Sequence, residues 1–212
     1  MKPLLALFDV DGTLFLTHDP IAGVALRDTL AERYAVDVPE DAIDRADHEG
    51  QTSLRIGRLV LLAGGVEEPK DLTGWCGRFA DRYVELLDEA DTSGWRAAPE
   101  AEQALERLAA AGVRLALLTG NPEPMARARM ERLGLDRFFP PGQGAFGCET
   151  ESRAELIAVA RHRAGGWPAA ATVEIGDTAR DASSSRAAGI RSVVVGEEGL
   201  TVDAIQQLLP SA

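Results

Sequence analysis

Acidic, hydroxyl and small residues follow three apolar segments of this sequence. Residues 4–8, 113–118 and 172–175 have the length and composition of buried β-strands. The residues that come after these segments are Asp9 and Asp11, then Thr119, Gly120 and Asn121, and then Gly176, Asp177 and Asp181. Because ligands of open parallel sheets bind outside the carboxyl ends of the strands, we expect these side chains to meet at one edge. A single acidic residue after a strand can be a helix cap, but three such strands together are hard to explain by capping.

These residue types suit metal-assisted phosphoryl transfer. Mg²⁺ prefers oxygen ligands, which the carboxylates of Asp9 and Asp177 could supply. A carboxylate can attack phosphorus to give an aspartyl-phosphate. A second carboxylate two residues on, Asp11, could protonate the leaving alkoxide and then accept a proton from water. Thr119 and the amides that follow it could bind the phosphoryl oxygens, because a helix N-terminus favours anions.

The chain from Pro99 onward alternates between helical and strand patterns. The expected strands are 113–118, 172–175 and 192–195, and the expected helices are 99–112, 122–134, one that starts at Ser152, 178–188 and 202–209. This alternation predicts an α/β fold, a Rossmann-like parallel sheet core with helices on both faces. Residues 15–96 have helical patterns instead, and we expect them to form a small all-helical cap domain. The predicted domains are therefore 1–14 with 97–212, and 15–96.

Three motifs in this order and spacing resemble the haloacid dehalogenase-like superfamily of hydrolases. They are DVDGTL at 9–14, LLTGN at 117–121 and GDTARD at 176–181. The fit is best to the phosphoglycolate phosphatase-like branch, in which a helical cap is inserted after the first strand. The resemblance implies Asp9 as the nucleophile, Asp11 as the general acid/base and Thr119 as a phosphate ligand, with Gly120 and Asn121 in the substrate site. It also implies Mg²⁺ as cofactor, held by Asp9, Asp177 and the backbone carbonyl of Asp11, with Asp181 as a direct or water-mediated ligand.

One position departs from the family pattern. The family usually places a lysine before a later helix, where it holds the nucleophile and the phosphate, but residues 71–212 contain no lysine. Arg153, at the start of the helix opened by Ser152, is the best match, and the alternative is a solvated surface arginine. In the expected cap, Gly50, Gln51 and Thr52 resemble a turn that faces the active site in phosphoglycolate phosphatase-like caps. These three residues could equally be a plain helix start.

The same residues favour a Mg²⁺-dependent phosphatase that acts on a small phosphorylated metabolite, phosphoglycolate being the first candidate. Asp11 argues against a dehalogenase, because those members of the superfamily replace the second aspartate of the first motif. A phosphosugar mutase of the same superfamily is the nearest alternative, since it differs only in returning the phosphoryl group to sugar. A catalytically silent protein of the same fold, which binds phosphate or metal, is a third possibility.

Composition limits the partners and the location. The chain has 212 residues and a formal net charge of −12, which disfavours binding to nucleic acid or to an anionic membrane. No signal peptide is recognisable and no apolar segment is long enough to cross a bilayer, so we expect a cytoplasmic protein. Cys76 and Cys148 are far apart in sequence and form no metal-binding pattern, and we expect them to be reduced residues that serve packing. The sequence gives no indication of an oligomeric state.

Overall fold

Within the described residues, a sheet of five parallel strands forms the centre of the molecule. The structure is a computed structural model that describes residues 4–39, 41–42, 45 and 47–209. The strands are β1 (Leu5–Phe8), β2 (Arg114–Thr119), β3 (Ala145–Phe146), β4 (Thr172–Gly176) and β5 (Arg191–Val194), in the spatial order β3-β2-β1-β4-β5. In the register of the sheet, Phe8 lies beside Leu117 on one side and Ile175 on the other. The carboxyl ends of β1, β2 and β4 therefore lie side by side, as the sequence predicted.

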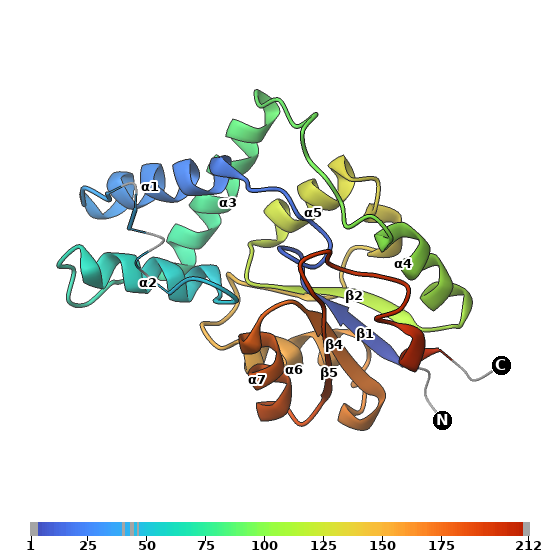
Figure 1. Cartoon of the computed structure of the whole chain (residues 1–212). Coiled ribbons are helices and arrows are strands. Elements are labelled where there is room, and N and C mark those ends of the chain that lie inside the picture. Colours follow the sequence, from blue (N-terminus) through green and yellow to red (C-terminus); the bar gives the residue numbers. More distant parts are fainter. Residues whose placement is uncertain (1–3, 40, 43–44, 46, 210–212) are drawn as a thin grey trace.

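Helices cover both faces of this sheet, which confirms the predicted α/β class. They are α4 (Ala101–Ala110) and α5 (Glu123–Arg132) on one face, and α6 (Arg153–Arg163) and α7 (Ala179–Ala187) on the other (Figure 1). Successive strand residues point to opposite faces. Ala6 and Phe8 pack with α4 and α5, whereas Leu5 and Leu7 pack with α6.

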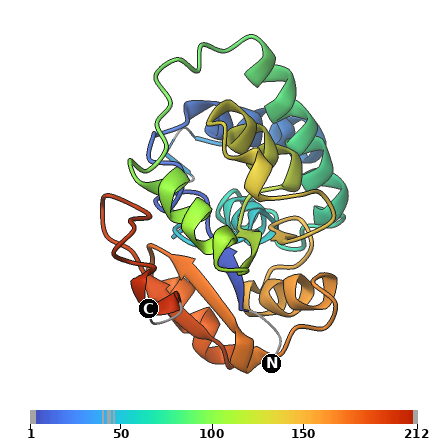
Figure 2. The same cartoon turned by 90° about the vertical axis from the view of Figure 1, so that its right-hand side faces the viewer.

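Three further helices lie outside the sheet layers. They are α1 (Pro20–Tyr34), α2 (Ser53–Ala63) and α3 (Leu72–Asp88), and they gather beyond the carboxyl ends of the strands (Figures 1 and 2). Their own apolar cluster is centred on Trp75, whose indole nitrogen donates a hydrogen bond to the Thr29 hydroxyl at 3.1 Å. Met125 of α5 also belongs to this cluster, so the helical layer packs directly against the α/β layer.

The two connections between these layers run alongside each other. The Ala98 amide donates to the Leu14 carbonyl at 3.0 Å, and the Leu16 amide donates to the Arg96 carbonyl at 3.0 Å. The Arg96 amide also donates to the Thr17 hydroxyl at 2.7 Å. This short ladder holds the entry to the helical layer and the exit from it together.

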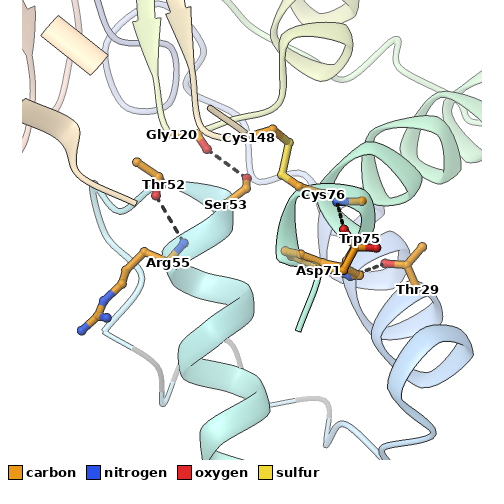
Figure 3. The surroundings of a disulfide bond; sticks show 10 residues. Thr29, Thr52, Ser53, Arg55, Asp71, Trp75, Cys76, Gly120 and Cys148 are labelled. Atoms are coloured by element: carbon orange, nitrogen blue, oxygen red, sulfur yellow. Dashed lines mark hydrogen bonds between the residues drawn. A yellow bond between two sulfur atoms is a disulfide. The ribbon is translucent and has the colours of Figure 1, made fainter. Parts of the chain in front are cut away.

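A disulfide joins the two layers at a second place, as Figure 3 shows. Cys76 in α3 is bonded to Cys148, which follows β3, and their Cα atoms are 5.6 Å apart. The prediction of two reduced cysteines is therefore wrong. Their separation of 72 positions conceals the contact in the sequence, but Cys76 belongs to the apolar cluster of the helical layer and Cys148 packs against it, so folding brings them together. A separation of 5.6 Å lies in the range that a disulfide spans.

Two other elements differ from the sequence prediction. The helix expected at 202–209 is absent, and only a turn of 3-10 helix forms at Gln206–Leu208. The expected segment is eight residues long, and short helices are marginal without strong packing of one face. The edge strand β3 was not predicted, because its two residues are too few to show an alternating pattern of apolar and polar side chains. In the described part of the chain, no helix combines the length and apolar character needed to cross a membrane.

Candidate active site

The first residue after β1 lies at the floor of the site. Asp9 is 5% exposed, and its amide donates to the Ile175 carbonyl at 2.9 Å, which continues the sheet pairing by one residue. This pairing fixes the Asp9 backbone between β2 and β4. The carboxylate therefore stands where the central strand opens into the cleft.

Arg153 approaches Asp9 from the face of the sheet that α6 and α7 cover. It is the first residue of α6, whose N-cap Ser152 accepts a hydrogen bond from the Glu155 amide. Its Nη2 lies 3.3 Å from Asp9 Oδ1, and the whole residue is 5% exposed. The alternative of a solvated surface arginine does not describe a residue this deeply buried.

Arg153 also contacts two other buried carboxylates. Its Nε donates to Glu174 Oε1 at 3.1 Å, and its Nη2 lies 2.6 Å from Asp181 Oδ1. Burial disfavours the guanidinium charge, but Asp9, Glu174 and Asp181 outweigh that effect and hold the pKa of Arg153 above its usual value. One cation is thus shared by the predicted nucleophile and by the carboxylates of Glu174 in β4 and Asp181 in α7.

Three carboxylates form a compact oxygen cluster. Asp9, Asp177 and Asp181 each offer an oxygen, and these oxygens all lie within 4.8 Å of one another. Two glycines make this approach possible. A Cβ on Gly12, where φ is +72°, would lie 2.1 Å from an Asp177 oxygen, and one on Gly176 would lie 2.5 Å from the Asp181 carboxylate.

The N-terminus of α7 orients Asp181. Thr178 is the N-cap, and both its amide and its hydroxyl donate to Asp181 Oδ2, at 2.9 and 2.7 Å. This capping box occupies one oxygen and leaves the other, Oδ1, facing Arg153. Although Oδ1 is close to the guanidinium, the geometry makes no hydrogen bond, and this buried oxygen has no hydrogen-bond partner.

The cluster fits a divalent cation. Burial raises the pKa of Asp9 to about 8, with Arg153 opposing the shift, and burial also raises the pKa of Asp177. Carboxylates packed this closely favour protonation unless a positive charge joins them. A hard cation such as Mg²⁺ takes carboxylate oxygens, and Asp181 Oδ1, which lies beside Arg153 without a hydrogen bond, is a candidate ligand.

The carboxyl end of β2 and the residues after it lie beside this cluster. Thr119 is 1% exposed, and its hydroxyl accepts hydrogen bonds from the Asn121 amide at 3.3 Å and from Asn121 Nδ2 at 3.1 Å. Asn121 Nδ2 also donates to Asp11 Oδ2 at 2.5 Å, so the first and second motifs are joined directly. Among the described residues the Thr119 hydroxyl donates no hydrogen bond, which leaves its proton for a ligand.

The helical layer closes over the same strand ends. The Ser53 hydroxyl donates to the Gly120 carbonyl at 2.9 Å (Figure 3), and the Ser53 amide donates to the same carbonyl at 2.8 Å. A Cβ on Gly120 would lie 1.9 Å from the Gln51 carbonyl. Gly50 and Gln51 line the cleft, so the structure places them opposite the carboxylates. Thr52 is 1% exposed and caps α2 through the Arg55 amide, and it is not among the residues that line the cleft.

The cleft between the layers has a volume of about 1220 Å³. Its lining includes five of the predicted residues around the phosphate and the metal, which are Asp9, Asp11, Thr119, Arg153 and Asp177. The predicted Asp181 lies just beneath, with 1% exposure.

Sequence reasoning missed two charged residues of this region. Glu174 lies in the middle of β4 and is fully buried, and Arg129 of α5 is 2% exposed. Each has a signal that could have been used, since Glu174 interrupts an apolar strand and Arg129 shares the helical face of Met125 and Met130. Charged residues at such positions are buried only with partners.

Comparisons with known proteins identify relatives of this chain. A sequence model of the haloacid dehalogenase-like hydrolase family matches residues 4–189. A phosphoglycolate phosphatase of Rhodospirillum rubrum is 32% identical over 199 residues, covering 91% of this chain and 79% of its own length. A second one, from Caulobacter vibrioides, is 29% identical and covers 95% of this chain and 82% of its own.

Solved structures show the same fold. CbbY from Rhodobacter sphaeroides in complex with phosphate superposes with a TM-score of 0.66 at 20% identity, covering 92% of this chain and 87% of that one. A β-phosphoglucomutase from Clostridium difficile gives a TM-score of 0.70 at 16% identity, covering 98% and 97%. The motifs, the fold and the family match together show that the chain belongs to the haloacid dehalogenase-like hydrolases, in the phosphoglycolate phosphatase-like branch, and that it is a phosphatase.

Proposed function

We propose that the protein is a Mg²⁺-dependent phosphatase that hydrolyses a small phosphorylated metabolite through an aspartyl-phosphate. The observation that carries this proposal is the shared environment of Asp9. Its carboxylate faces the cleft beside the Arg153 cation, with the carboxylates of Asp177 and Asp181 within ligand distance of one another and of Asp9. We also propose the domain division 1–14 with 97–212 for the core, and 15–96 for the cap.

In the first half of the reaction, an oxygen of Asp9 attacks phosphorus and the bond to the leaving alkoxide breaks. Asp11 gives its proton to that alkoxide, so the alcohol leaves neutral. Thr119 donates a hydrogen bond to the transferring group, and the Arg153 guanidinium balances its charge from beneath. Mg²⁺, held by Asp9, Asp177, Asp181 and the backbone carbonyl of Asp11, would screen the charges of the nucleophile and the phosphate.

In the second half, Asp11 accepts a proton from the attacking water. The water oxygen bonds to phosphorus, the bond to Asp9 breaks, and inorganic phosphate leaves with Asp9 regenerated. Asp11 holds the proton that the next turnover requires. Closure of the helical layer would keep bulk water from the reacting group in both steps.

We propose phosphoglycolate as the first substrate to test. The relatives carry that name, and phosphoglycolate presents a carboxylate in addition to its phosphate. Arg27 of α1 lines the cleft on the cap side and makes no ion pair with the described residues. An unpaired guanidinium suits a second anionic group. Arg27→Gln should therefore raise KM for phosphoglycolate and leave KM for p-nitrophenyl phosphate nearly unchanged.

The test is phosphate release from a panel of phosphorylated metabolites, with Mg²⁺ and with excess EDTA. We expect turnover only with Mg²⁺, and its loss in Asp9→Asn. Asp37→Asn, the same chemical change at an exposed position, is the matched control and should keep full activity. Turnover in EDTA, or more than a few per cent of it in Asp9→Asn, would reject the mechanism. Conversion of a sugar phosphate to its isomer without phosphate release would identify a mutase.

A further inference from the structure

A second buried arginine links the core to the helical layer. Arg129 of α5 is 2% exposed and lies between Asp11, the proposed acid/base, and Asp19, the N-cap of α1. Its Nη1 donates to Asp11 Oδ1 at 2.7 Å, and its Nη2 donates to Asp19 Oδ2 at 2.8 Å. The two nitrogens of one planar guanidinium therefore hold one carboxylate from each layer.

The cap side of this link is built rigidly. Asp19 Oδ1 accepts a hydrogen bond from the Ile21 amide at 3.0 Å, and Oδ2 accepts a second one from the Tyr83 hydroxyl at 2.7 Å. The guanidinium carbon also lies 5.0 Å from the centre of the Phe15 ring and 5.6 Å from that of Tyr83. Arg129 has little freedom to move in this setting.

The core side is different, because Asp11 is an accessible group. Its side chain is 53% exposed, whereas that of Asp19 is 3% exposed. The need to neutralise the buried Asp19 carboxylate would account for a buried arginine at this place. That need alone would not require the arginine to bind Asp11 as well. Arg129 on one oxygen and Asn121 on the other fix both the position and the plane of the Asp11 carboxylate.

We propose that Arg129 is a positioning residue that sets the orientation of Asp11 and ties it to the N-terminus of α1. A displacement of α1 moves Asp19. Because the Arg129 guanidinium binds both aspartates, it then shifts as well, and its hydrogen bond to Asp11 changes. Proton transfer at the leaving group then depends on the seating of the helical layer. This inference rests on the proposed role of Asp11 as acid/base.

The test compares variants on two substrates, an alkyl phosphate and p-nitrophenyl phosphate, whose leaving group needs little protonation. Arg129→Lys keeps the charge but cannot make both bonds with one planar group. We expect it to lower kcat/KM roughly tenfold or more on the alkyl phosphate, and much less on p-nitrophenyl phosphate, which follows from the size of acid/base contributions. Arg132→Lys, the same change at an exposed position of α5, is the control and should leave both values unchanged.

A double variant shows whether Arg129 acts through Asp11. Adding Arg129→Lys to Asp11→Asn should lower kcat/KM on the alkyl phosphate by less than about threefold, because coupled residues are not additive. Equal losses on both substrates, or full additivity, would overturn the inference and leave a structural role. If Arg129→Lys does not fold, Asp19→Asn gives the same test, since asparagine retains the N-cap but loses the ion pair with Arg129 and the hydrogen bond from Tyr83.

The same experiment separates the two proposals. If Asp11→Asn alone shows no loss specific to the alkyl phosphate, the acid role in the proposed mechanism fails. If Asp11→Asn shows that loss and neither Arg129→Lys nor Asp19→Asn does, only the positioning role fails.

Discussion

Replacing Arg153 by methionine tests the charge balance beneath the nucleophile. The substitution keeps most of the volume of the side chain and removes its charge, which leaves Asp9, Glu174 and Asp181 buried around an apolar group. Breaking a buried ion pair by removing one partner costs about 3–5 kcal/mol. Since a whole domain is stable by about 5–15 kcal/mol, Arg153→Met should lose a large part of the free energy of unfolding.

This loss should depend on pH. Burial raises the pKa of Glu174 and Arg153 opposes that shift, so removing the arginine raises it further. The folded variant then binds more protons than the folded wild type, and its stability relative to wild type falls as pH rises. One extra proton held across two pH units is worth about 2.7 kcal/mol. We therefore expect the loss to be smaller at pH 5.5 than at pH 7.5, by no more than the ~2.7 kcal/mol that one full proton is worth over this interval.

The assay is urea unfolding in EDTA at both pH values. Arg82→Met is the matched control, because the ion pairs that Arg82 forms with described residues, Asp28 and Glu85, lie at the surface, and such pairs contribute little. A loss in Arg153→Met below about 1 kcal/mol, or one equal at both pH values, would refute the reasoning, because a buried ion pair is worth more than that. Under conditions where the variant stays folded, kcat/KM should fall at least about tenfold. Arg153→Lys should fall less, since it keeps the charge without the two-point geometry.

Three further outcomes are expected. In metal-free protein the free energy of unfolding should fall as pH rises from about 4 to 8, because the folded state holds a proton on Asp9 that the unfolded state releases. In Asp9→Asn, urea unfolding at several pH values should show a smaller change of this free energy with pH, and an unchanged pH dependence would contradict this. Reducing the Cys76–Cys148 bond with dithiothreitol should cost about 2–4 kcal/mol in the same assay, and a Cys76→Ser variant should not respond to the reagent. Gly120→Ala should lower both activity and melting temperature, since its Cβ would lie 1.9 Å from the Gln51 carbonyl, and wild-type values for both would show that the cap does not seat there.

Much of the fold could be predicted from the sequence because its signals are local. Apolar runs bounded by turn residues located β1, β2 and β4, and the capping-box pattern at Ser152 located the start of α6. The edge strand β3 and the disulfide could not be found in this way. The former is two residues long, and the latter depends on how α3 docks against the loop after β3.

The same distinction between local signals and long-range contacts applies to the site. Asp9 and Asp177 each follow a strand and Thr119 ends one, so the parallel sheet alone brings them to one edge. What the motifs did not reveal is the set of charges that surrounds them. Glu174 and Arg129 take their meaning from partners far away in sequence, and only the folded structure shows which carboxylate each one meets.

Two buried arginines give this acidic chain its charge balance at the strand ends. Each is shared between a residue of the proposed chemistry and a carboxylate outside it: Arg153 between Asp9 and Glu174, and Arg129 between Asp11 and Asp19. A lysine in either place would offer a single charged nitrogen, whereas the planar fork reaches two partners at fixed separation. The arginine at 153, where the family usually has lysine, is thus matched to a buried glutamate in β4 that gives the second arm of the fork its partner. The arginine at 153 and the glutamate inside β4 therefore make physical sense as a pair.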